Sequence, residues 1–148
     1  MQRPVEERTG YLLKRAQQAL RTRMDRELAA FGLGAAGYAV LTALASQPGL
    51  SAAELARRSF VTPQTMMRTV SSLQASGLVH RPAHPAAGRK LPAELTPFGH
   101  QVLAQAHSAI GAVEAEMVHT LDGQEQEVLR SLLLRIADAL TAQAKHRT

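Results

Sequence analysis

The chain has 148 residues and a mass of 15.9 kDa, with 45% hydrophobic and 20% charged residues. This is the size of one domain with enough apolar material to offset the entropy of ordering the chain, which argues against two independent domains and against disorder. The formal net charge of +5 makes polyanions the first class of partner to consider. Cysteine is absent, which excludes disulfides, thiolate nucleophiles and cysteine-based zinc sites.

The N-terminus and the longest uncharged stretch argue against export and membrane insertion. The first eight residues already contain Glu6 and Glu7, whereas a secretion signal opens with a basic and then an apolar region. Residues 28–45 carry no charge, but Ala and Gly predominate and three glycines interrupt the stretch, so we interpret it as a turn followed by a buried helix. We therefore expect a soluble, cytoplasmic protein that does not enter a membrane.

The first two predicted helices cover residues 9–30 and 35–46. Apolar residues recur at close to helical spacing in the first helix, and Gly32 and Gly34 end it. The second helix ends in the turn Gln47-Pro48-Gly49. Their inward stripes consist of Leu13, Ala16, Leu20, Met24 and Leu28 in the first helix, and of Tyr38, Leu41 and Leu44 in the second.

Two shorter helices separated by a three-residue turn are predicted next. Ser51 and Glu54 have the spacing of a capping box, in which each side chain satisfies a backbone N–H at a helix start. After the turn at residues 59–61, Thr62 and Pro63 form an N-cap and first-turn pair, because proline lacks the N–H that would be unsatisfied there. The fourth helix is expected over residues 63–76, closed by Gly77.

A β-hairpin and two long helices complete the predicted elements. Residues 78–81 and 90–95 are expected strands on either side of the stretch PAHPAAG, and Pro92 makes the second an edge or bulged strand because proline cannot donate to a ladder. Thr96-Pro97 repeats the N-cap signal, and Asp122 begins a second capping-box pattern. The apolar stripes are Leu103, Ala106, Ile110, Val113 and Met117 in the fifth helix, and Leu129, Leu132, Leu133, Ile136 and Leu140 in the sixth.

The central elements follow the order of a winged helix-turn-helix, which places one helix in the major groove of DNA. If Met66 faces inward, Val70 and Leu73 lie within about 40° of it on the fourth helix. Between residues 51 and 95, six Arg and Lys against two Glu give this part of the chain +4 of the total charge of +5. The polar side chains on the outward face are Gln64, Arg68, Ser71 and Ser72.

These outward side chains suit base recognition. Gln pairs bidentately with adenine, Arg pairs with O6 and N7 of guanine, and Thr or Ser binds bases or phosphates. A solvated helix face has the same composition, but the hairpin and the local positive charge favour DNA over that alternative. We predict base contacts from Gln64, Thr65, Arg68 and Ser72, and phosphates near Ser51 and Thr62.

The sequence GLSAAELARRSFVTPQTMMRTVSSLQASGLVHR, followed by a wing containing GR and closing in ELTPFG, resembles the MarR family of multiple-antibiotic-resistance regulators. The resemblance covers nearly the whole chain, because the SxxELA helix, the LxxxGLVxR exit, the LTxxG restart and the flanking helices occur in the family's order. It implies one domain over residues 1–148, mainly α with a small β-hairpin wing. A winged helix-turn-helix lobe at 48–95 would be flanked by helical dimerisation and packing regions at 9–46 and 96–143.

The resemblance also implies partners for the chain. It implies a homodimer on a pseudo-palindromic site in double-stranded DNA, which agrees with the need of three amphipathic helices for an apolar partner. It places Arg89 in a minor groove with Lys90 beside it, but Ala87 replaces the second acid of the wing pattern D-P-x-D-G-R, so the carboxylate that would orient Arg89 is missing. It further implies a small anionic or phenolic effector near Tyr11, Arg15 and Tyr38, although packing and surface roles suit the same residues.

Other classes of function are weaker expectations. The sequence contains no Gly-rich phosphate loop and no G-x-S-x-G motif, and His100 and His107 lack metal-binding spacing, so we predict no enzyme, no cofactor and no metal site. Five aromatic residues offer few stacking platforms for single-stranded nucleic acid. We expect a sequence-specific transcriptional regulator, a ligand-responsive repressor by resemblance. The alternative is a winged-helix protein-interaction module that does not bind DNA.

Overall fold

The computed structural model describes residues 3–81 and 93–145, and side chains up to residue 142. The chain divides into two compact units, residues 1–113 and 114–148, and the boundary falls inside one long helix. The first unit contains α1 (Thr9–Leu28), α2 (Ala35–Ser46), α3 (Ala52–Arg58), α4 (Pro63–Ala75), β1 (Val79–His80), β2 (Glu94–Leu95) and most of α5 (Pro97–Val118). Short 3₁₀ turns, η1 (Val5–Glu7) and η2 (Ala29–Phe31), flank α1, and α6 (Gly123–Lys145) forms most of the second unit.

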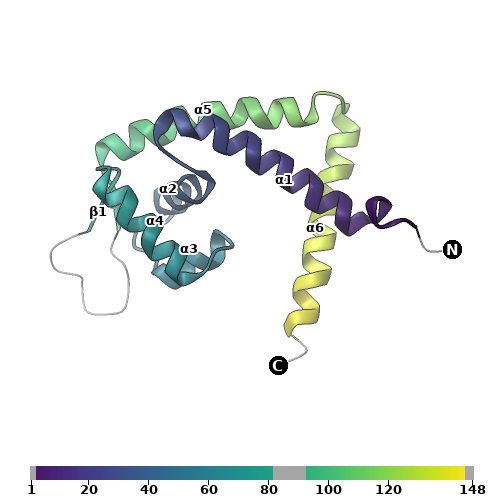
Figure 1. Ribbon diagram of the computed structural model, residues 1–148, viewed down its shortest axis with the longest axis horizontal. Coiled ribbons are helices and arrows are strands. Elements are labelled where there is room, and N and C mark those ends of the chain that lie inside the picture. Colours follow the sequence, from purple (N-terminus) through teal and green to yellow (C-terminus); the bar gives the residue numbers. More distant parts are fainter. Residues whose placement is uncertain (1–2, 82–92, 146–148) are drawn as a thin grey trace. The chain divides into compact units, whose positions relative to one another are not determined.

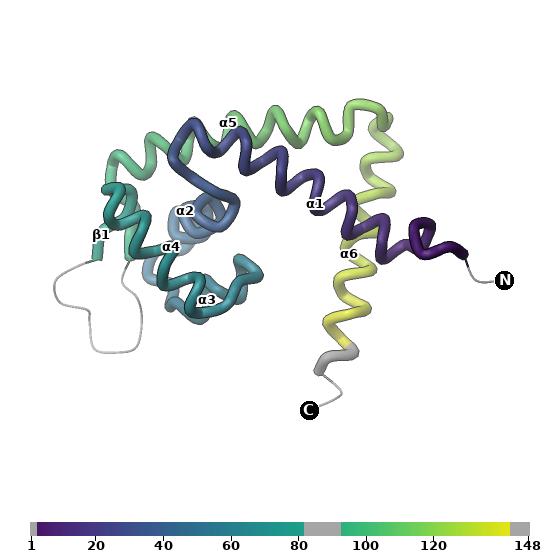
Figure 2. Tube along the Cα trace, in the orientation of Figure 1, coloured from purple at the N-terminus to yellow at the C-terminus, as the bar shows by residue number. Residues whose placement is uncertain are grey.

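The first unit is built around α2, which contacts α1, α3, α4 and β2 (Figure 1). The chain leaves α1, passes Gly32 and turns by 74° into α2 (Figure 2). Leu41 and Leu44 of α2, Leu55 of α3 and Val70 of α4 are at most 1% exposed. The predicted mainly α lobe with a small hairpin is therefore confirmed, and its core lies where α2, α3 and α4 meet.

Local signals set the ends of these helices as predicted. The capping box of α3 is complete, since the Ser51 hydroxyl accepts a hydrogen bond from the Glu54 N–H and the Glu54 carboxylate accepts one from the Ser51 N–H. Gly77 follows α4 with a φ of +73°, the left-handed conformation that glycine adopts without strain. In the second unit, Asp122 and Glu125 exchange the same pair of bonds at the start of α6.

The strands and three of the apolar stripes differ from the prediction. The ladder pairs only Val79 with Leu95 and His80 with Glu94, and so is shorter than expected within the described residues. Leu13 of α1 and Met117 of α5 are 40% and 52% exposed, although both stand on predicted inward stripes. No side chain that the structure describes in α6 is buried. Helical periodicity identified apolar faces that this single chain leaves uncovered.

Of the helices in the described ranges, none alone is both long and apolar enough to span a bilayer, and one bent pair, residues 9–31 with 35–46, meets the criterion by length and composition only.

The turn between α3 and α4 contains a strained residue. Phe60 has a φ of +54°, and its ring is 96% exposed. The Val61 N–H donates to the Ala56 carbonyl across this turn, which is the way a helix closes on a left-handed residue, normally glycine. A non-glycine residue in this conformation costs roughly 1–2 kcal/mol.

We expect the Phe60→Gly substitution to raise the free energy of unfolding by about 1 kcal/mol, because it removes the clash of Cβ with the backbone and loses almost no packing. Phe60→Ala is the matched control, since it removes the exposed ring but keeps Cβ, and it should leave stability nearly unchanged. Urea denaturation at one fixed chain concentration measures both. An equal rise in the free energy of unfolding for the two variants would show that the exposed ring, and not the left-handed backbone, destabilises the protein.

Candidate nucleic-acid interface

The outward face of α4 rests on a buried inner face. Met66 and Val70 are fully buried and Leu73 is 5% exposed, as the helical spacing predicted. Gln64, Thr65, Arg68, Ser71 and Ser72 are all exposed. Within the described part of the chain, the side chains of Gln64, Arg68 and Ser72 make no hydrogen bond or ion pair, so their donors and acceptors are available to a ligand.

The start of α4 uses one of the predicted phosphate-binding hydroxyls for itself. The Thr62 hydroxyl accepts a hydrogen bond from the Thr65 N–H at 3.2 Å and donates to the Thr65 hydroxyl at 3.0 Å. Its proton is therefore already used, whereas the proton of the Thr65 hydroxyl remains available. Thr62 caps the N-terminus of α4, and Thr65 is the better donor to an incoming anion.

Ser51 is engaged in the same way at the start of α3. Its hydroxyl donates to the Glu54 carboxylate at 2.7 Å while accepting from the Glu54 N–H at 3.2 Å. Ser51 is half-buried. The predicted role of Ser51 near a phosphate thus competes with its role as the N-cap of α3, which the sequence pattern also predicted.

The wing begins at the short ladder next to α4. β1 contacts α4, and His80 and Glu94 face each other across the ladder with 3.8 Å between His80 Nε2 and Glu94 Oε2. Arg89 and Lys90, the predicted minor-groove and backbone contacts, lie outside the described residues. The structure therefore positions the base of the hairpin against α4.

Hydrogen bonds of Thr96 connect the residues after α4, the base of the hairpin and the start of α5. Its hydroxyl donates to the Gly77 carbonyl at 2.6 Å and accepts from the Gly99 N–H at 3.0 Å. Its own N–H donates to the Leu78 carbonyl at 3.0 Å. The backbone of α5 approaches Leu78 so closely that a Cβ on Gly99 would stand 3.0 Å from the Leu78 carbonyl carbon and closer still to its oxygen. This junction holds the start of α5 against the two residues that precede β1.

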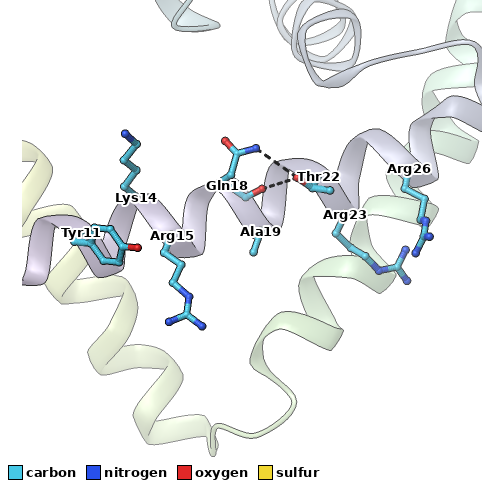
Figure 3. A pocket seen from close by; sticks show the side chains of 8 residues that line it. All are labelled: Tyr11, Lys14, Arg15, Gln18, Ala19, Thr22, Arg23 and Arg26. Carbon is cyan, nitrogen blue, oxygen red and sulfur yellow. Dashed lines mark hydrogen bonds between the residues drawn. The ribbon is translucent and has the colours of Figure 1, made fainter. Parts of the chain in front are cut away.

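Two of the three predicted effector residues lie together. Tyr11 and Arg15 line a concave surface along α1, one helical turn apart, and Arg15, Ala19 and Arg23 point to the same side in Figure 3. Its cationic side chains suit an anion. The surface is lined by Tyr11, Lys14, Arg15, Gln18, Ala19, Thr22, Arg23 and Arg26.

Tyr38, the third predicted effector residue, is not part of that surface. Its hydroxyl hydrogen-bonds to His107 Nδ1 of α5 at 2.7 Å, and the two rings meet edge to face with centroids 5.4 Å apart. This contact gives Tyr38 a packing role between α2 and α5, the alternative that the sequence left open. In the ranges that the structure describes, no three His, Asp or Glu side chains cluster as metal ligands.

Sequence reasoning missed one residue on the outward face of α4. Met67 is 41% exposed, next to the fully buried Met66. The available signal was the pair of consecutive methionines, since neighbours on a helix are about 100° apart and one of the two turns outward.

Three comparisons identify what the chain is similar to. A model of the MarR family matches residues 31–90. The HTH-type transcriptional repressor Rv2887 of Mycobacterium tuberculosis is 36% identical over 127 residues, which cover 86% of this chain and 91% of the repressor. The crystal structure of Rv2887 with salicylic acid has a TM-score of 0.72 at 35% identity, covering 91% of this chain and 97% of that one. The structure of Rv2887 with DNA has a TM-score of 0.74 at 32% identity, covering 91% and 98%.

Proposed function

This chain belongs to the MarR family of transcriptional regulators, and from that premise we propose that it is a repressor that binds pseudo-palindromic double-stranded DNA as a homodimer. The observation that carries the proposal is the outward face of α4, where Gln64, Arg68 and Ser72 are exposed and make no hydrogen bond among the described residues, above a buried inner face. A rigid base with free polar groups is the arrangement that base recognition in a major groove requires. The similar repressor Rv2887 has been crystallised with DNA.

The uncovered apolar faces support the homodimer. Exposed leucines stand on α1 and α6, and a two-fold interface would remove them from water. The two copies of α4 would then be presented about one helical turn of DNA apart, roughly 34–36 Å. The exposed apolar side chains on these two helices are Tyr11, Leu12, Leu13, Val128, Leu132, Leu133, Leu134 and Leu140.

The contacts divide between bases and backbone. In the proposal, Gln64 pairs with adenine, Arg68 with guanine, and Thr65 and Ser72 with bases or phosphates. Ser51 and Thr62 shape the helix starts next to the phosphates. Arg89 enters a minor groove from the wing, and Lys90 adds charge to the backbone contacts. We also propose that the protein is cytoplasmic, where chromosomal DNA is accessible, and that it has no enzymatic activity.

Selection of bound fragments from the source genome, followed by titration at several salt concentrations, tests the proposal. We expect the logarithm of the association constant to fall linearly with the logarithm of salt concentration, because bound cations displace counterions from phosphates. Lys90→Ala should weaken binding to all sequences about equally and make this slope shallower by about 1 for each phosphate that is no longer neutralised. A winged-helix module that binds only protein would select no fragment over random DNA.

A small phenolic acid is the proposed effector, and salicylate is the probe. Rv2887 has been crystallised with salicylic acid, and Tyr11 and Arg15 line a concave cationic surface in this chain. Salicylate should release the selected DNA, and Arg15→Gln should weaken this effect about tenfold by removing a charge-assisted hydrogen bond. Salicylamide, which lacks the negative charge, is the control ligand. Unchanged release from the Arg15→Gln variant would remove Arg15 from the effector site.

A further inference from the structure

Met67 is a large apolar side chain on a face that is otherwise polar. Within α4, which the structure describes completely, the other large apolar side chains are the buried Met66, Val70 and Leu73. Met67 is 41% exposed. A large part of this apolar side chain is therefore open to solvent on the outward side of the helix.

Helix geometry places Met67 at the edge of the outward face of α4, beside the proposed base contact Gln64. At about 100° per residue, Met67 lies about 60° around the helix from Gln64 and about 40° from Ser71. These residues are three before and four after it, the spacing at which side chains on a helix are neighbours. Both neighbours are exposed. Met67 thus stands next to an amide and a hydroxyl at one edge of the outward face.

The chemistry of the major groove offers one apolar feature to such a side chain. The base edges present hydrogen-bond donors and acceptors, and thymine alone adds a C5-methyl group. The adenine edge that Gln64 would read lies beside the methyl group of the paired thymine. The methionine side chain is unbranched and flexible, so it can adjust its conformation to contact that methyl group.

We propose that Met67 is a specificity-determining residue that packs, in each half-site, against the methyl group of the thymine paired with the adenine that Gln64 reads. This proposal rests on the proposed function, since it requires α4 to lie in the major groove. It predicts that the preferred operator carries a thymine, in a symmetric pair, whose methyl group contributes to affinity.

Replacement of thymine by uracil in the selected operator tests the proposal, because it deletes the methyl group and leaves every hydrogen-bonding group in place. With one symmetric pair replaced, the unaltered protein should lose about fourfold in affinity per half-site, the effect of one buried methyl group, or roughly 15-fold in total. Met67→Gln should bind the thymine and uracil operators equally, and Met67→Leu should keep the preference for thymine. Thermal denaturation checks that both variants fold.

A second readout follows Met67 itself. In NMR spectra of protein labelled at the methionine ε-methyl groups, the chemical shift of Met67 should change when the thymine operator binds. With the uracil operator the change should be smaller. The buried Met66 serves as the internal reference. A uracil effect of the same size in Met67→Gln and in the unaltered protein would overturn the assignment of Met67. Failure of the unaltered protein to prefer any duplex would instead overturn the proposed function.

Discussion

Gly99→Ala should destabilise the first unit by about 3 kcal/mol or more, the largest effect expected of a Gly→Ala substitution at the glycines that the structure describes. The added Cβ would enter the space of the Leu78 carbonyl group, and both sides of the clash are backbone, so no side chain can rotate away. Moving α5 back would stretch the hydrogen bonds that Thr96 makes to Gly77 and to Gly99. The junction between α4, the hairpin and α5 would be disrupted with them.

Gly111 in the same helix provides the control. A Cβ there would meet no atom within 4 Å, so Gly111→Ala should raise helix stability by roughly 0.5–1 kcal/mol through the lower entropy of the unfolded chain. Urea denaturation at one chain concentration compares the two variants, since the stability of a dimer depends on concentration. Comparable midpoints for the Gly99 and Gly111 variants would contradict the close approach of α5 to Leu78.

The same glycine illustrates what the sequence could predict and what it could not. The caps at Ser51 and Thr62 and the turn at Gly77 were predictable, because each is decided by groups within four residues of one another. The contact that requires Gly99 joins it to Leu78, far away along the chain, and no periodicity reveals it. The left-handed Phe60 is a second example, since residue propensity favours glycine in this conformation and the sequence has a phenylalanine there.

In the candidate site, too, the sequence could predict some features and not others. Helical spacing predicted that Met66, Val70 and Leu73 face inward, and the burial of all three confirms it. Spacing could not show that the hydroxyls of Ser51 and Thr62 are already used as donors inside their own caps. Apolar stripes were also predictable, but the exposure of Leu13 and Met117 depends on which chain covers them, and a single sequence does not contain that information.

Arg68→Ala should reduce affinity for the operator by about tenfold or more per half-site while leaving the free energy of unfolding unchanged. A bidentate contact of Arg to guanine discriminates by about 1–3 kcal/mol, and a homodimer makes the contact twice. The Arg68 side chain is exposed and has no partner within the described ranges, so its removal breaks no contact in the free protein. Competition titrations should show that most of the loss falls on the operator and little on random DNA.

Arg68→Lys separates charge from geometry. Lysine keeps the positive charge but is a point donor without the planar fork, so this variant should retain the salt dependence of the unaltered protein and still lose specificity. An operator with 7-deazaguanine, which lacks the N7 acceptor and keeps O6, removes one of the two hydrogen bonds of this contact from the DNA side. It should weaken the unaltered protein and have no further effect on Arg68→Ala. If Arg68→Ala instead loses equal affinity for operator and random DNA, Arg68 binds a phosphate, and guanine must be read by another side chain of α4.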